Sequence, residues 1–79
     1  MYNSDESHMT DREKALNELY YQIGREGLYN VDNIRIADQS NPDEFQAYDK
    51  QASQGCCGSF DTTVTINNTV YMIGCNYGH

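Results

Sequence analysis

The chain has 79 residues, with twelve acidic and five basic side chains and a formal net charge of −7. A chain of this length buries only about 60% of its unfolded surface, so we expect one small domain with a thin core. A domain of this size argues against a multi-step cofactor enzyme. Only thirteen side chains are Leu, Ile, Val or Phe, and so small a number beside a high net charge is a feature of disordered chains. The negative charge disfavours direct binding to nucleic acid or to an anionic membrane, because both are polyanions.

The N-terminal sequence has no basic segment followed by an apolar one, and the longest apolar run, 70–73, is too short to cross a bilayer. The cysteine count is odd and two cysteines are adjacent, unlike the paired cysteines of secreted mini-proteins. We therefore expect reduced thiols and a cytoplasmic protein.

Residues 1–9 are polar and aperiodic, which predicts a flexible arm followed by one domain over 10–79. Thr10 and Glu13 have the spacing of a capping box, and Gly27 suits a left-handed helix ending. These signals predict a helix over 11–26. Its core-facing stripe is expected to consist of Leu16, Leu19, Tyr20 and Ile23.

The segment Asn30–Asp38 alternates in hydropathy and predicts a short strand with Ile34 and Ile36 turned inward. Asn41 followed by Pro42 then predicts the start of a second helix, because Asn caps a helix and Pro is tolerated at its first position. We expect this helix to end at Gly55. Its inward face is expected to carry Phe45, Tyr48 and Ala52.

The segments Phe60–Ile66 and Thr69–Cys75 flank Asn67-Asn68 and predict a hairpin, since asparagine tolerates the positive φ of a two-residue turn. With that turn, the apolar residues of both strands lie on one face. The expected cross-strand pairs are Ile66 with Thr69, Val64 with Tyr71, Thr62 with Ile73 and Phe60 with Cys75. The other face receives Asp61, Thr63, Thr65, Val70 and Met72.

The element order is therefore helix, strand, helix, strand, strand. It predicts an α+β domain with a three-stranded, mostly antiparallel sheet and both helices packed on one face of it.

The cysteines and one histidine form a candidate metal set with three sulfur ligands and one nitrogen ligand: Cys56, Cys57, Cys75 and His79. Adjacent cysteines rarely bind one ion. On a continuing strand, Cys75 and His79 would also lie about 13 Å apart, so only a bend at Gly78 would bring them together. The favoured alternative is that the cysteines are small buried thiols, and no cofactor is expected.

Four acidic residues occur without a base in 38–49, and Asp32 would adjoin them across the preceding strand. The candidate partner-binding set is Asp32, Asp38, Asp43, Glu44 and Asp49. Such a patch would attract a protein with a basic surface. The alternative is an ordinary solubilising surface.

The hairpin is nearly uncharged, because Asp61 is the only charged side chain in 51–79. Proteins usually protect an exposed strand with lysine or proline, and the hairpin has neither. Its second candidate interface comprises Val70, Tyr71, Met72 and Tyr77, residue types that are enriched in interfaces. The sequence leaves open whether this surface forms a homodimer, binds another subunit or is covered by the N-terminal arm.

The chain contains no recognisable catalytic constellation, so we expect no enzyme activity. In its small size, acidity, reduced cysteines and α+β pattern it resembles the inhibitors that bacteriophages make against host defence, such as anti-CRISPR proteins. The resemblance implies a phage protein that acts in the host cytoplasm and occupies a basic, nucleic-acid-binding groove of a host complex. The two alternatives are an accessory or homo-oligomeric subunit and a small zinc-stabilised domain.

Overall fold

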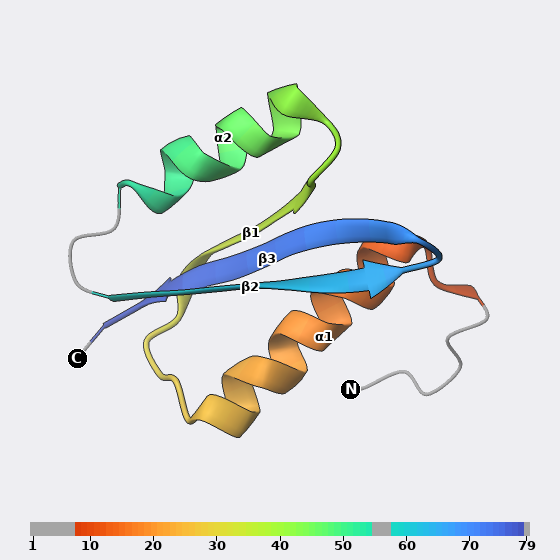
Figure 1. The fold of residues 1–79 in the computed structure, drawn as a ribbon. Helices are drawn as coiled ribbons and strands as arrows, with labels where there is room; N and C mark the ends of the chain where they lie inside the picture. The colour runs from red at the N-terminus through yellow and green to blue at the C-terminus, as the bar shows by residue number, and fades with distance from the viewer. Residues whose placement is uncertain (1–7, 55–57, 79) are drawn as a thin grey trace.

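The computed structural model describes residues 8–54 and 58–78. It has the expected α+β order of elements (Figure 1). The elements are α1 (Asp11–Glu26), β1 (Asp32–Asp38), α2 (Pro42–Ala52), β2 (Gly58–Ile66) and β3 (Thr69–Tyr77).

The three strands form one antiparallel sheet in the order β1-β3-β2, so the last strand is the central one. The predicted register of the hairpin is confirmed at every pair from Phe60 with Cys75 to Ile66 with Thr69. Asn67 and Asn68 have φ values of 50° and 68°, the positive values that a turn of the primed type requires. Both hairpin strands are two residues longer than predicted.

Helix α1 begins and ends where the sequence predicts. The Thr10 hydroxyl accepts a hydrogen bond from the Glu13 amide at 3.1 Å, and the Glu13 carboxylate accepts one from the Thr10 amide at 2.8 Å. At the other end Gly27 has a φ of 69°, and the Leu28 amide donates to the Ile23 carbonyl at 3.1 Å. These are the bonds of a capping box and of a Schellman ending.

The apolar core lies between α1 and one face of the sheet. Its buried members are Ala15, Leu19, Tyr71 and Ile73, and the two isoleucines of β1 pack against them as predicted. The expected inward position of Tyr20 is wrong, since this side chain is 54% exposed. Ala15 is buried instead, so the helix is rotated slightly from the orientation that its larger apolar residues suggested.

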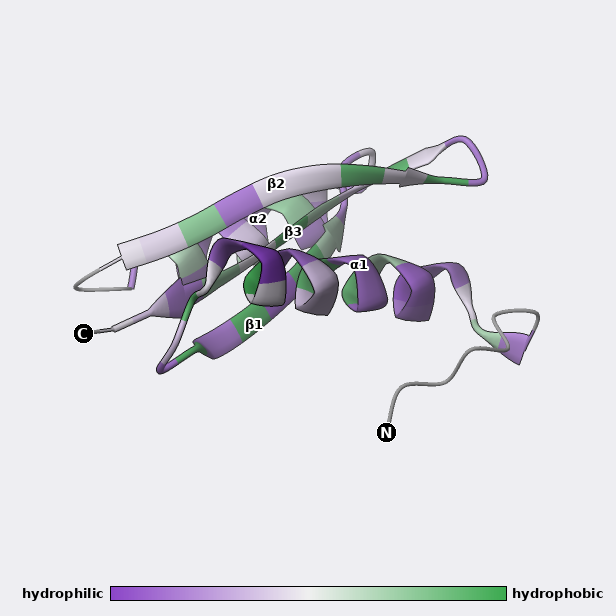
Figure 2. Ribbon diagram, turned by 90° about the horizontal axis from the view of Figure 1, so that it is seen from below, coloured by the Kyte–Doolittle hydropathy of each residue, from purple (hydrophilic) through white to green (hydrophobic). Residues whose placement is uncertain are grey.

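The two helices lie on opposite faces of the sheet, not on one face as predicted. Figure 1 shows the sheet between α1 and α2, and in Figure 2 α1 lies in front of the sheet and α2 behind it. Side chains alternate along a strand, so the residues that flank Ile36 and Ile73 point away from α1. On that second face Arg35 and Ala37 are buried, and α2 covers β1 and part of β3.

Helix α2 makes a polar rather than an apolar contact with the sheet. It starts as predicted, with the Asn41 side chain accepting from the Asp43 and Glu44 amides. Tyr48 is its one buried residue, whereas Phe45, expected inside, is 46% exposed. The helix ends at Ala52, three residues before the predicted end at Gly55, which lies outside the described residues.

Strand β1 starts two residues later than predicted, and its pairing is irregular near this start. Asn33 has a φ of 52°, and the pairing with β3 shifts between Asp32 and Arg35. The Asn33 side chain donates to the Gln51 carbonyl at 3.0 Å, so the bulge contacts the last turn of α2.

The two-sided arrangement predicts that core truncations differ sharply between the helices. Leu19→Ala should lower the free energy of unfolding by about 2–5 kcal/mol, because it leaves a cavity under α1. Phe45→Ala should cost less than about 1 kcal/mol, because its side chain is largely in solvent. Urea denaturation of both variants would check this, and a similar loss for each would contradict the placement of α2.

Candidate functional site

The predicted acidic patch is divided by an ion pair that joins the two helices. Arg12 of α1 donates from both terminal nitrogens to the Glu44 carboxylate of α2, at 2.8 and 2.7 Å. The Glu44 carboxylate also accepts from the Asp38 amide at 3.0 Å. Arg12 lies 5.7 Å from the centre of the Tyr71 ring, a cation–π contact. Glu44 is therefore occupied within the domain.

These bonds favour the charged forms of both partners. The hydrogen bond from Arg12, followed by the one from the Asp38 amide, lowers the pKa of Glu44 below its ordinary value of 4.5. The same bond to Glu44 raises the pKa of Arg12. The pair is partly exposed to solvent, so its role is to position the start of α2 at the edge of β1 rather than to supply much stability.

The remaining acidic residues are distributed along α2 and the ends of β1. Asp43 and Asp49 are exposed on α2, and Asp49 is four residues after the exposed Phe45, on the same side of the helix. Asp38 accepts two hydrogen bonds from Ser40 at the turn before α2, and Asp32 lies at the opposite end of β1. The five carboxylates are close together in the sequence, but in the fold they are spread along α2 and the two ends of β1.

The predicted hairpin interface is not a single surface. Tyr71 and Tyr77 lie on the α1 face, whereas Val70 and Met72 lie on the α2 face, since neighbouring residues of a strand alternate. Tyr71 is 6% exposed and belongs to the core, so it is unavailable to a partner. Strand β3 is also paired on both sides, which leaves no free edge on this strand.

A buried polar cluster under α2 was missed by the sequence reasoning. The Arg35 side chain is 1% exposed and donates to Asp61 at 2.9 Å and to the Asn76 side chain at 2.9 Å. It also donates to the carbonyls of Asn33 and Cys75, while its Nε has no partner among the described residues. The Tyr48 ring lies 5.2 Å from the guanidinium carbon.

Tyr48 connects this cluster to α2. Its hydroxyl donates to Asp61 at 2.6 Å, and burial together with this bond raises the pKa of Tyr48. Gly74 lies directly below, and a Cβ there would collide with the Tyr48 hydroxyl and Asp61. Two signals in the sequence pointed to this cluster: an arginine between two inward isoleucines, and a glycine inside a strand.

In the described part of the chain, no arrangement of side chains supports the candidate metal site. Cys75 is a buried free thiol, and burial raises its pKa, as expected of a packing residue. Cys56, Cys57 and His79 lie outside the described residues. Within 8–54 and 58–78 no group of three metal-ligating side chains comes together.

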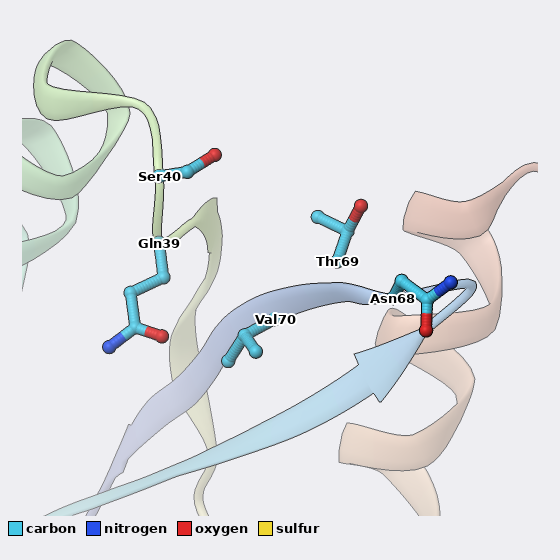
Figure 3. A pocket seen from close by; sticks show the side chains of 5 residues that line it. All are labelled: Gln39, Ser40, Asn68, Thr69 and Val70. Atoms are coloured by element: carbon cyan, nitrogen blue, oxygen red, sulfur yellow. The ribbon is translucent and has the colours of Figure 1, made fainter.

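Two shallow cavities accompany these surfaces. One, of about 270 Å³, lies between the end of β1 and the hairpin and is lined by Gln39, Ser40, Asn68, Thr69 and Val70 (Figure 3). The other, of about 200 Å³, lies along α1 between Met9 and Tyr20. The first lining has no charged side chain, and the second has one, Glu13.

Comparisons with protein-family models, curated proteins and solved structures found no match for this chain. In the described residues, neither helix has the length and apolar character needed to cross a membrane.

The Arg12–Glu44 pair predicts a pH-dependent contribution to stability. Because folding lowers the pKa of Glu44, the contribution is present above about pH 4.5 and is lost as the pH falls through the folded-state pKa. Glu44→Gln should flatten the fall in unfolding free energy between about pH 5 and pH 3, as measured by urea denaturation. Arg12→Met should remove most of the same slope, and an unchanged slope in both variants would contradict the pairing.

The buried cluster predicts coupled losses of stability. Asp61→Ala leaves the Arg35 charge without its counter-ion and should cost about 3 kcal/mol, the low end for buried pairs because Asp61 is 41% exposed. Tyr48→Phe should cost about 1 kcal/mol in the original chain and close to nothing in the Asp61→Ala background. Denaturant titrations of the two single variants and the double variant test this, and additive losses would argue against the bond.

Proposed function

We propose that this chain is a small protein-binding inhibitor that presents carboxylates to a basic surface of a larger complex. The observation that carries the proposal is the charge that remains after internal pairing. Arg12 and Arg35 are occupied by Glu44 and Asp61. The remaining bases are Lys14, Arg25 and Lys50, and the remaining carboxylates outnumber them.

The exposed side of α2 is the part of this charge best suited to binding. We use the name α2 surface for the residues Asp43, Phe45 and Asp49. The two carboxylates would steer a basic partner toward the helix, and the half-exposed phenylalanine would provide an apolar anchor beside Asp49. Asp43 is two residues before Phe45 and so lies on another side of the helix. The helix is fixed from behind by Tyr48 and at its start by Glu44, so this surface is presented without rearrangement.

The resemblance to phage inhibitors suggests the kind of basic surface. A groove that binds nucleic acid is lined with arginine and lysine, and carboxylates on a rigid helix can take the places of phosphates. The chain would then act by competition with the nucleic acid or by blocking assembly of the host complex, without chemistry of its own.

The proposal predicts that capture depends on the α2 surface. The immobilised protein and the variant Asp43→Asn/Asp49→Asn would be exposed to a bacterial lysate, and bound proteins identified by mass spectrometry. A basic, nucleic-acid-binding protein should be retained by the original chain, lost at least about tenfold by the variant, and displaced by added single-stranded DNA or RNA.

Glu18→Gln/Glu26→Gln is the matched control, because it removes the same charge from α1. If the control loses binding equally, only the net charge matters and the α2 surface is not the site. If the retained protein is unaffected by competing nucleic acid, the proposed mode of inhibition is wrong.

A further inference from the structure

The two edge strands of the sheet, β1 and β2, differ in how well they are protected from pairing with a further strand. Strand β1 has a bulge at Asn33 and is covered by α2. Strand β2 forms the opposite edge and pairs with β3 without interruption over Gly58–Ile66. It contains no lysine, arginine or proline, the residues that usually prevent edge-to-edge pairing. In the described part of the chain, β3 is the only strand that pairs with β2.

The hydrogen-bonding groups on this edge follow from the register. The Val70 carbonyl accepts from the Gln39 amide, so Val70 and every second residue of β3 after it bond toward β1. The residues between them bond toward β2, where their partners are Phe60, Thr62 and Val64. The amides and carbonyls that point outward from β2 therefore belong to Ser59, Asp61, Thr63 and Thr65.

We propose that a second copy of this chain binds to this edge, with the two β2 strands antiparallel about a two-fold axis at Thr62. Ser59 then pairs with the second copy's Thr65, and Asp61 pairs with the second copy's Thr63. The two-fold axis repeats both pairs, so all four outward residues of each strand are hydrogen-bonded. The result is a continuous six-stranded sheet.

The strand matches itself best in this register. An axis at Asp61 would place two aspartates directly opposite each other, which is unfavourable. An axis at Thr63 would place Ser59 opposite the second copy's Asn67, beyond the end of β2, and leave its groups unpaired.

The side chains that this register places opposite each other between the two copies are also compatible. On the α1 face, an axis at Thr62 places Phe60 beside the second copy's Val64, an aromatic and a β-branched residue that pair well, and the two Thr62 side chains face each other. Phe60 and Val64 are only partly buried within one copy, so the contact would cover apolar surface that is otherwise exposed. The polar face is lined by hydroxyl side chains and by Asp61, whose charge is compensated by Arg35 of its own copy.

The effect of salt distinguishes self-association through β2 from the binding of a basic partner to the α2 surface. Two copies with a net charge of −7 repel each other, and added salt screens that repulsion. Self-association should therefore strengthen as the salt concentration rises, whereas binding of a basic partner to the α2 surface should weaken. The two proposals can consequently fail independently.

The unmodified chain provides the first test. Sedimentation equilibrium from micromolar to millimolar concentration, at low and high salt, should show a monomer–dimer equilibrium that shifts to dimer with salt. Amide hydrogen exchange should slow with concentration at Ser59, Asp61, Thr63 and Thr65, and should stay equally slow at Phe60, Thr62 and Val64. A monomer at every concentration, or protection that does not follow this alternation, would overturn the proposal.

The register is tested by charge exchange at two exposed positions that face each other only between copies. Ser59→Lys/Thr65→Lys places lysines opposite lysines and should raise the dimer dissociation constant at least about tenfold. Ser59→Glu/Thr65→Glu should do the same. An equimolar mixture of the two variants should regain dimers, because every lysine then faces a glutamate.

Gln46→Lys/Gln51→Lys is the control, since it adds the same charge at exposed positions of α2, outside β2. Weakening by this control as large as that by the β2 lysines would show a general charge effect and overturn the assignment of the edge. Dimers that persist in both β2 variants, or a mixture that does not regain dimers, would also overturn it.

Discussion

Arg35 holds a positive charge between the sheet and α2, where its side chain is almost completely shielded from water. Its hydrogen bonds must therefore be accepted by other groups of the protein. Two side chains and two main-chain carbonyls do so. Asp61 provides the opposing charge and at the same time accepts from Tyr48, the one buried residue of α2. The position of the second helix therefore depends on how one buried cation is satisfied.

The two sides of the sheet consequently use different forces. On one side α1 buries aliphatic side chains against the centre of the sheet, which is the usual source of stability in a small domain. On the other side α2 is held by directional bonds at Tyr48, at the Asn33 bulge and at Glu44. Such bonds fix orientation more than they add stability. They leave the outward side of α2 free of packing constraints and the β2 half of that sheet face uncovered.

Signals from neighbouring residues predicted the helices and strands well. The sequence did not predict how α2 packs on the sheet, which depends on contacts between distant residues. The caps of α1, the start of α2 and the turn at Asn67 depend on neighbouring residues, and each was predicted correctly. Whether α2 packs on the same face as α1 depends on Arg35, Asp61 and Tyr48 meeting across 26 residues of chain, which no local pattern encodes. The internal pairing of Glu44 was not predicted for a similar reason, because its partner comes from the other helix.

The central position of β3 also constrains the order of events when the chain is made. Strand β1 has no strand partner until β3 has been synthesised, and its pairs join residues as distant as Asp32 and Asn76. The apolar side of α1 likewise lacks Tyr71 and Ile73 until then. On a ribosome β1 would remain without its strand partner until β3 emerges, and the aspartates at both ends of β1 would help to keep it from aggregating during this time.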